Sequence, residues 1–281
     1  MCFSSHAEAG SSLCSVSPAL VDKDLLRQQF RRAAASYEQQ AVIQRRTAER
    51  LLDLLAQHCV RPPQQVLEIG CGTGLLTRSL IGRFSGIREL ILNDLVPDFA
   101  SRLDLPAFSP AVRLLSGDIE VLPLLGGLDL VLSASTFHWL HDLDGLLVKL
   151  AACLRPGGLL AFSLYGPENL REIRALTGIG LRYRSLTEIA ASLRRHFTLL
   201  HSSHETVTLR FASPQDVLRH LRQTGVNALS RSLWSRSRLE QFCAEYRRRF
   251  SADDGGVALS YHPLYFVARR GEDTHRSCPA T

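Results

Sequence analysis

The sequence predicts an α/β fold in which a mainly parallel sheet carries helices on both faces. Between residues 65 and 165, five short and nearly all-apolar segments alternate with segments of helical periodicity. Strands of that composition are buried on both faces, as they are in parallel sheets covered by helices. A glycine-rich turn, GCGTG at 70–74, separates the first strand from its helix, and such turns usually hold a nucleotide.

The region before the sheet is predicted to be helical. Residues 22–58 repeat apolar side chains at helical spacing and are rich in Ala, Gln, Arg and Glu, which predicts one or two helices. The segment Arg61-Pro62-Pro63 ends this region.

Five strands follow from the apolar runs, and helices follow from the periodic segments between them. The expected strands are residues 65–70, 89–94, 112–118, 128–135 and 159–165, and the expected helices are residues 74–84, a short stretch after Pro97, and residues 141–154. Pro156-Gly157-Gly158 is expected to turn the chain into the fifth strand.

The pattern changes beyond Tyr165. Helices are expected at about 167–176 and 186–195, after Pro214 and near Ser237, and strands at 197–211 and 257–270, which bring the sheet to seven strands. Helices between the last two strands would cover an edge of the sheet as a lid. The expected divisions are a disordered tail at 1–21, N-terminal helices at 22–62 that cover the ligand site, a ligand-binding core at 63–165, the rest of the sheet with the lid at 166–270, and a tail at 271–281.

The composition of the chain bears on the cellular compartment in which it works. No run of about 18 apolar residues suggests a transmembrane helix. Residues 1–20 have neither the basic nor the apolar segment of a signal peptide. The seven cysteines are odd in number and form no CxxC pair, which favours a reducing cytoplasm over a disulfide framework.

The chain is basic, with a net charge of +6. The excess is mostly arginine in the C-terminal half, for example at 231–238 and 247–249. Two interpretations stay open: solvated helix faces, or a docking surface for an acidic partner, either nucleic acid or an acidic protein.

The spacing of the glycines separates two kinds of ligand. Gly70, Gly72 and Gly74 allow a sharp bend and a close approach of the backbone to a ligand. A dinucleotide turn has the spacing G-x-G-x-x-G and points helix N–H groups at a pyrophosphate. Here the pattern is E-x-G-x-G-x-G, and the carboxylate of Glu68 would repel a phosphate and suit a cationic ligand.

This turn resembles motif I of the class I S-adenosylmethionine-dependent methyltransferases, whose fold is Rossmann-like. The resemblance implies S-adenosylmethionine as methyl donor, with Asp94, or its neighbour Asn93, on the ribose hydroxyls. It also implies that Asp118 in GDIE binds the adenine amino group, with Ile119 beside the ring. The segment LRPGG at 154–158 matches the family's turn before strand five, and these motifs together cover residues 65–165.

Flanking segments resemble one family, the malonyl-acyl-carrier-protein O-methyltransferases of biotin synthesis. Residues 30–44 match its opening pattern F-x-x-A-A-x-x-Y, with a Gln later on the same helix. The segments SASTFHWL at 133–140, LRQTGVNAL at 221–229 and YHPLYFVARR at 261–270 resemble its segment after strand four, its lid segment and its closing strand. The resemblance covers about residues 25–270.

The glycine turn and the two resemblances together imply a set of site residues. Those expected to bind the cofactor are Tyr37, Gln44, Glu68, Gly70, Cys71, Gly72, Gly74, Asn93, Asp94, Leu95, Asp118, Ile119 and Ser133, and those expected in the substrate pocket are His138 and Trp139. Cys71 is interpreted as a small buried thiol rather than a nucleophile. No metal is expected, because neither His138/His141 nor His201/His204 has a Cys or acid to complete a site.

The resemblance implies that the acceptor is the free carboxylate of a malonyl group on acyl carrier protein. A carboxyl group with a pKa of about 4 is ionised at neutral pH, so no general base is expected and the enzyme mainly orients the reactants. An arginine would orient the carboxylate, and Arg222 is the first candidate and Arg171 the second. We expect Arg222→Ala to impair methylation while cofactor binding persists.

Other interpretations remain open. In one of them the methyl acceptor is another small carboxylic acid. In a second the acceptor is RNA, although no RNA-binding module is evident and nucleic acid is not favoured. In a third, the chain is a non-catalytic partner subunit that binds S-adenosylmethionine. The sequence does not indicate the oligomeric state, the preference for carrier protein over coenzyme A, or a role for the first 20 residues.

Overall fold

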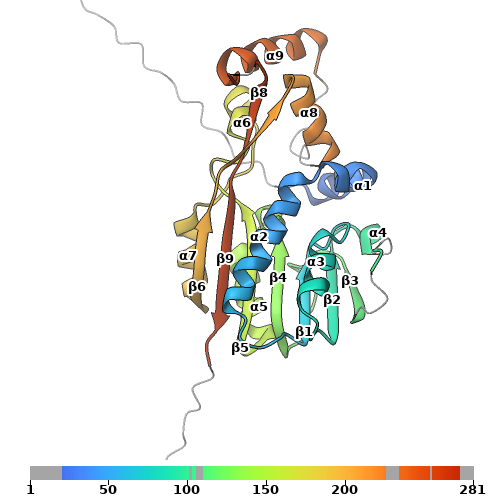
Figure 1. Ribbon diagram of the computed structural model, residues 1–281, viewed down its shortest axis with the longest axis vertical. Helices are drawn as coiled ribbons and strands as arrows, with labels where there is room; N and C mark the ends of the chain where they lie inside the picture. Colours follow the sequence, from blue (N-terminus) through green and yellow to red (C-terminus); the bar gives the residue numbers. More distant parts are fainter. Residues whose placement is uncertain (1–20, 101–102, 106–109, 226–233, 254, 273–281) are drawn as a thin grey trace, which may run out of the picture.

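The computed structural model describes residues 21–100, 103–105, 110–225, 234–253 and 255–272. Within them, the main sheet has seven strands in the order β3-β2-β1-β4-β5-β9-β6 (Figure 1). Strands β1 to β5 run parallel, whereas β9 pairs antiparallel with β5 and β6. The prediction of a mainly parallel seven-stranded sheet is confirmed. The strands are β1 (Gln65–Ile69), β2 (Glu89–Asp94), β3 (Ala111–Ser116), β4 (Leu128–Ala134), β5 (Leu154–Tyr165), β6 (Phe197–His204), β7 (Val207–Phe211), β8 (Val257–Tyr261) and β9 (Pro263–Arg270).

Helices cover both faces of this sheet. Side chains alternate along each strand, so Val66 packs with α2 and α3 on one face, while Leu67 packs with α5 and α7 on the other. The two apolar clusters that result form the core. The helices are α1 (Lys23–Gln40), α2 (Val42–His58), α3 (Leu75–Arg83), α4 (Pro97–Ala100), α5 (Leu143–Cys153), α6 (Arg171–Thr177), α7 (Leu186–Arg194), α8 (Pro214–Gln223) and α9 (Arg236–Phe250), with a 3-10 turn at Phe137–Trp139.

The N-terminal helical region is two helices. Asp22 caps α1 by accepting hydrogen bonds from the N–H groups of Asp24 and Leu25. The chain leaves helical geometry at Ala41, with φ −79° and ψ 46°, and continues as α2. α2 packs on the sheet, whereas α1 runs over to contact α8 (Figure 1). The break therefore lets one helix support the core and the other cover the end of the sheet.

The two long C-terminal strands were expected to be continuous, and this was wrong. Each divides in two: β6 and β9 belong to the main sheet, and β7 and β8 form a separate antiparallel pair that extends beyond it (Figure 1). The breaks, at Glu205-Thr206 and at His262, lie side by side, because the Glu205 N–H donates to the carbonyl of Pro263 at 3.1 Å. Residues typical of strands stand on both sides of each break, so the strand pattern does not show that the strands change partners.

The β7–β8 pair carries its own small core. Tyr246 of α9 and Leu259 of β8 are fully buried there, and α6, α8 and α9 pack around them. α6 begins at Arg171, four residues later than expected, since the chain turns first through Leu170 at φ +50°. β5 begins earlier than expected, at Leu154, which already pairs with β4.

Some expectations fall outside the described residues. These are the tails at 1–20 and 273–281, three of the seven cysteines, and the part of the expected lid segment from residue 226 to residue 229. In the described part of the chain, no helix has the length and apolar character needed to cross a membrane.

Candidate active site

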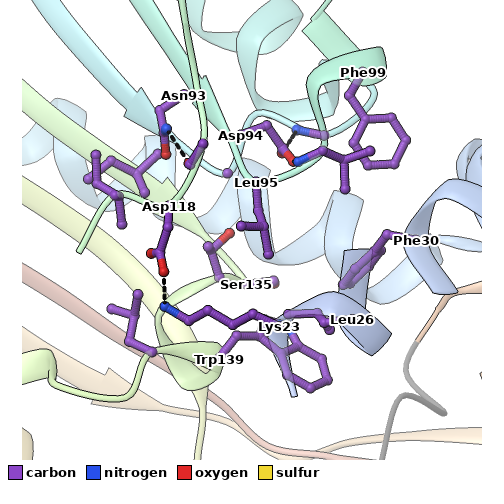
Figure 2. A pocket seen from close by; sticks show the side chains of 18 of the residues that line it. Lys23, Leu26, Phe30, Asn93, Asp94, Leu95, Phe99, Asp118, Ser135 and Trp139 are labelled. Carbon is purple, nitrogen blue, oxygen red and sulfur yellow. Dashed lines mark hydrogen bonds and ion pairs between the residues drawn. The ribbon is translucent and has the colours of Figure 1, made fainter. Parts of the chain in front are cut away.

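A cavity lies between α1 and the ends of the parallel strands, and Figure 2 shows it from close by. α1 forms one wall, and the opposite wall comes from the segments that directly follow β1, β2, β3 and β4. The lining residues are Lys23, Leu26, Phe30, Tyr37, Ile69, Gly70, Gly72, Thr73, Asn93, Asp94, Leu95, Val96, Phe99, Gly117, Asp118, Ile119, Ala134, Ser135, Thr136, Trp139 and Leu140. Ligands of open α/β sheets bind in this place, at the carboxyl ends of the strands.

The glycine turn has the backbone that its sequence indicates. Gly70, Gly72 and Gly74 have φ values of +75°, +51° and +87°, a region that other residues rarely adopt. A Cβ on Gly70 would also overlap the side chain of Thr136. Gly70 and Gly72 line the cavity, whereas Cys71 is buried and burial raises the pKa of its thiol well above the usual range. These properties agree with an inert thiol at Cys71.

Asn93 and Asp94 are adjacent in sequence, but their side chains form hydrogen bonds with different segments. The Asn93 amide donates to the carbonyls of Leu115 and Gly117, at 2.7 and 3.0 Å, and so fixes the end of β3. Asp94 accepts from the N–H of Gly72 at 2.8 Å and of Val96 at 2.7 Å. Burial raises the pKa of Asp94 to about 6, although the two hydrogen bonds act in the opposite direction and lower it. Of the two residues, Asp94 presents the carboxylate to the cavity (Figure 2).

Asp118 is paired with a residue that the sequence analysis missed. The ammonium of Lys23, on α1, lies 2.6 Å from Asp118 Oδ2 (Figure 2) and also contacts the carboxylate of Glu120. Partial burial is the largest single influence on the pKa of Asp118 and raises it, but the hydrogen bonds from Lys23 and from the Glu120 N–H, together with the charge of Lys23, outweigh burial and lower the pKa. The start of α1 is therefore pinned to the segment that follows β3.

The same segment is held from its other side. Lys149, on α5, donates to the carbonyl of Ile119 at 2.8 Å. Lys23 and Lys149 are the only two lysines in the sequence. Because every other strong base of the chain is arginine, the rarity of lysine was the signal that could have pointed to both residues.

Behind the turn lies a group of buried polar atoms without partners. Glu68 is fully buried on the face of β1 that packs on α2 and α3, and neither of its carboxylate oxygens has a hydrogen-bond partner among the described residues. Burial raises the pKa of Glu68 to about 8; the neighbouring Thr77 hydroxyl opposes this shift, and the charge of Asp94 adds a smaller increase. Other such atoms are Gln44 Oε1, Thr47 Oγ1, Thr73 Oγ1 and Thr77 Oγ1. Unsatisfied groups of this kind are rare in folded proteins and indicate a place where a polar ligand or water completes the structure.

Aromatic and aliphatic side chains form the apolar walls. The Phe30 ring packs edge-on against Tyr37 and Trp139, with centroids 6.3 and 6.1 Å away. Leu95 and Ile119 line the cavity from the opposite side. Burial raises the pKa of Tyr37 well above its usual value, so its hydroxyl keeps its proton.

Ser133 and Ser135 have different surroundings. Ser133 is fully buried and donates to the carbonyl of Ile69 at 2.8 Å, and it does not line the cavity. Ser135, two residues later, does line it and was not predicted. Gln44, Glu68, Cys71 and Gly74 also lie outside the cavity lining, behind or within the glycine turn.

A second cavity adjoins the first, and Leu140 lines both. His138 and Tyr165 line the second cavity, with ring centroids 4.9 Å apart, whereas Trp139 lines the first. Burial lowers the pKa of His138 to about 3, so its ring is neutral. The two residues expected in the substrate pocket are thus divided between neighbouring cavities.

The two arginine candidates lie away from both cavities. Arg222 is exposed near the end of α8. Arg171 is half-exposed and forms ion pairs with Glu168 and Glu172. Neither contributes to the lining of either cavity.

The histidine pairs make other contacts. His141 bonds the carbonyl of Val21, His201 bonds Ser203, and His204 bonds His262. Across the described ranges, no group of three or more His, Cys, Asp or Glu side chains is placed to hold a metal ion.

The similarity to known proteins spans nearly the whole chain. Residues 67–162 match the family described as "Methyltransferase domain". The chain is 39% identical over 259 residues to the malonyl-acyl-carrier-protein O-methyltransferase of Chlorobium luteolum, covering 90% of this chain and 98% of that one. It is 43% identical over 260 residues to the protein of the same name from Chlorobium phaeovibrioides, covering 89% and 98%.

A third protein of this name, from Bacteroides fragilis, is 39% identical over 257 residues, and the chain spans only 52% of its length. Among solved structures, a methyltransferase in complex with the Trm112 activator from Haloferax volcanii superposes with a TM-score of 0.59 at 19% identity, covering 89% of this chain and 99% of that chain. The YcgJ protein from Bacillus subtilis gives 0.54 at 16%, covering 79% and 98%. These two likenesses show the fold alone. The identity and coverage of the curated relatives show more: this chain belongs to the malonyl-acyl-carrier-protein O-methyltransferase family.

Proposed function

We propose that this protein transfers the methyl group of S-adenosylmethionine to the free carboxylate of a malonyl group carried by acyl carrier protein. The observation that carries this proposal is the match of about nine tenths of the chain to relatives of that name at 39–43% identity. The product would be the methyl ester, which the resemblance associates with the start of biotin synthesis. A cytoplasmic location stays a prediction.

The residues present fit the methyl donor. S-adenosylmethionine supplies an electrophilic methyl group on a positively charged sulfur. It also has an amino group and a carboxyl group. Among the unpartnered buried atoms, Thr73 Oγ1 belongs to a residue that lines the cavity and is suited to meet one of these groups, whereas Glu68, behind the turn, would act on the positive charges of the ligand through its own charge. The approach of the backbone at Gly70 and Gly72 leaves room for a ligand that lies flat against the turn.

Asp94 and Asp118 would hold the nucleoside. Asp94 is already oriented by two backbone N–H groups, so its remaining lone pairs are suited to the two ribose hydroxyls. Asp118 would accept from the adenine amino group while it keeps its pair with Lys23, and Leu95 and Ile119 would enclose the ring. Tyr37 and Trp139 would cover the other end of the ligand. With the nucleoside there, the space between Gly70 and Ser135 is left for the reacting atoms.

The reaction then needs orientation more than acid–base chemistry. The acceptor carboxyl, with a pKa of about 4, is ionised roughly a thousandfold over its acid form at pH 7. Correct alignment of two bound reactants is worth about 7–11 kcal/mol. α1 and the small core of α6, α8 and α9 would keep water from the cavity, in line with the proposed division into covering helices, binding core and lid.

Acyl carrier protein is the proposed macromolecular partner. The last turn of α9 carries Arg247, Arg248 and Arg249, all exposed. An acidic partner would be steered to such a surface, and the rate of association would fall as salt is added. RNA would be steered in the same way, so charge alone does not choose between the two.

Methyl transfer from radiolabelled S-adenosylmethionine tests the proposal. The acceptors to compare are malonyl-acyl carrier protein, malonyl-coenzyme A, free malonate and bulk tRNA. We expect label on the malonyl thioester, strongest with the carrier protein. Label on free malonate alone would indicate a small-acid methyltransferase, and label on tRNA alone an RNA enzyme. Tight cofactor binding without transfer to any of the four would indicate a non-catalytic subunit.

A further inference from the structure

Ser135 and Tyr165 lie where the two cavities meet. Ser135 lines the first cavity, Tyr165 lines the second, and their hydroxyl oxygens are 3.3 Å apart. Tyr165 is 4% exposed, and burial raises the pKa of its hydroxyl well above the usual value. A ligand that spans the two cavities would lie beside this pair of hydroxyl groups.

The backbone of Ser135 is strained. Its φ is +55°, and in the described residues it shares a positive φ with only one other non-glycine residue, Leu170. β5 holds it in this conformation, because the Ser135 N–H donates to the carbonyl of Ser163 at 3.0 Å and the Tyr165 hydroxyl meets its side chain. Glycine would adopt the same backbone without strain. Strain of this kind persists where the surroundings enforce it, and it is concentrated at functional sites.

The charges around the pair favour a neutral contact. No arginine belongs to the described lining of the first cavity, and its lysine, Lys23, is engaged by Asp118 and Glu120. The second cavity is lined by Arg182 and Arg184 together with three acidic residues, and Arg184 pairs with one of these, Asp144, at 3.3 Å. His138, beside Tyr165, is neutral. In the proposed reaction a carboxylate and a sulfonium lose their charges together. A fixed cation at the carboxylate would stabilise the charged reactants more than the transition state and would slow the step. Neutral hydroxyl donors orient the acceptor with less of that penalty.

We propose that the Ser135 hydroxyl donates to the carboxylate of the acceptor at the junction of the two cavities. In the structure this hydroxyl donates to the Tyr165 oxygen. When the acceptor is bound, the Ser135 proton turns to the carboxylate and the Tyr165 hydroxyl donates to Ser135 Oγ in its place, which positions the serine. This inference rests on the proposed function. The free carboxylate oxygen forms a bond to the methyl carbon with one of its lone pairs, and the bond from that carbon to sulfur breaks, leaving its electron pair on sulfur. A methyl ester and a neutral thioether result, and no proton is transferred. Ser135 is the residue that touches substrate, and Tyr165 is a positioning residue.

Two substitutions at Ser135 separate function from folding. Ser135→Gly removes the hydroxyl and relieves the backbone strain, so we expect a melting temperature equal to or above that of the wild type. The expected kcat/KM for malonyl-acyl carrier protein is about 10- to 100-fold lower, the usual effect of losing a hydrogen bond to a charged group. The Kd for S-adenosylmethionine should stay within about twofold. Ser135→Ala should show the same kinetic loss without the gain in stability.

Tyr165→Phe tests the positioning role, with Tyr261→Phe as the matched control. Tyr261 is equally buried, its ring is 5.9 Å from that of Tyr165, and its hydroxyl bonds His220 outside both cavities. Tyr165→Phe should lower kcat/KM for the acceptor several-fold, whereas Tyr261→Phe should not. In the Ser135→Gly background, Tyr165→Phe should have no further kinetic effect, because a residue that acts through Ser135 loses its role with it.

The outcomes distinguish this inference from the function on which it rests. If the wild type does not methylate malonyl-acyl carrier protein, the proposed function fails before any variant is compared. If the wild type is active and Ser135→Gly retains full kcat/KM, the inference is overturned. It is also overturned if the substitution weakens S-adenosylmethionine binding instead, or if Arg222→Ala or Arg171→Ala produces the acceptor defect while the hydroxyl variants do not.

Discussion

The buried carboxyl group of Glu68 predicts an unusual dependence of stability on pH. Its pKa is about 8 in the folded protein, against 4.5 for the free side chain, because burial disfavours the charged form. Between these two pH values the folded protein holds a proton that the unfolded chain has lost. The contribution of Glu68 to stability is therefore fully present below pH 4.5 and is lost as the pH rises through 8.

The size of the effect follows from the same two values. A difference of one bound proton changes the free energy of unfolding by about 1.4 kcal/mol per pH unit. From pH 5 to pH 8, the contribution of Glu68 falls by about 3–4 kcal/mol on this reasoning. Glu68→Gln keeps the shape of the side chain and removes its titration. The difference in unfolding free energy between variant and wild type should therefore shift in favour of the variant by that amount across this range.

Urea unfolding at pH 5, 6, 7 and 8, without S-adenosylmethionine, measures this difference. Glu240→Gln is the control, because Glu240 is an exposed residue of α9 and its substitution should leave the pH dependence of the wild type unchanged. Parallel curves for wild type and Glu68→Gln would refute the reasoning and would mean that Glu68 is already ionised in the free protein. A second readout is proton release. A cationic ligand lowers the pKa of Glu68, so binding of S-adenosylmethionine at pH 7 should release up to about 0.9 proton, seen by calorimetry in buffers of different ionisation enthalpy.

Three further predictions concern the same cavity. The pKa of Asp94 is raised to about 6, so the affinity for S-adenosylmethionine should fall as the pH drops below 6, and Asp94→Asn should weaken binding and flatten this dependence when Kd is measured from pH 5 to 8. Gly70→Ala should abolish cofactor binding and lower the melting temperature, because its Cβ overlaps Thr136. Gly72→Ala, whose Cβ meets no protein atom within 4 Å, should lower the free energy of unfolding by only the backbone strain of about 1–2 kcal/mol, and an equal loss of stability in the two variants would contradict this. Lys23→Met leaves two carboxylates facing each other and should destabilise the protein by about 1–3 kcal/mol in urea unfolding, an effect that salt reduces; an unchanged unfolding midpoint would show that the contact does not contribute.

The central fold and the glycine turn were accessible from sequence because their signals are local. Apolar runs buried on both faces predict parallel strands, and the order strand, turn, helix follows directly along the chain. The bend at Gly70 and Gly72, and the position of Asp94 at the end of a strand, follow from the same short-range pattern.

What the sequence did not reveal depends on contacts between distant segments. The residues typical of a strand in 197–211 are the same whether the strand stays with β9 or passes to β8. Ser133 and Ser135 are equivalent in the pattern, and only the kink at φ +55° decides which of them lines the cavity. Lys23 reaches Asp118 across 95 positions of sequence, and no local motif encodes that contact.

Because lysine is so scarce, amine-reactive reagents can modify this chain at very few positions. Apart from the amino terminus, a reagent that acylates amines has only Lys23 and Lys149 to modify, and both are occupied at the segment that follows β3. The Lys23 side chain is 16% exposed and held by Asp118 and Glu120, so we expect its modification to be faster when the first turn of α1 detaches. The rate, followed by peptide mass spectrometry with and without S-adenosylmethionine, would then report how often the cavity is uncovered. Lys149, a partly buried residue of α5, serves as the internal reference. The protein thus carries its own probe of cofactor entry, without any engineered residue.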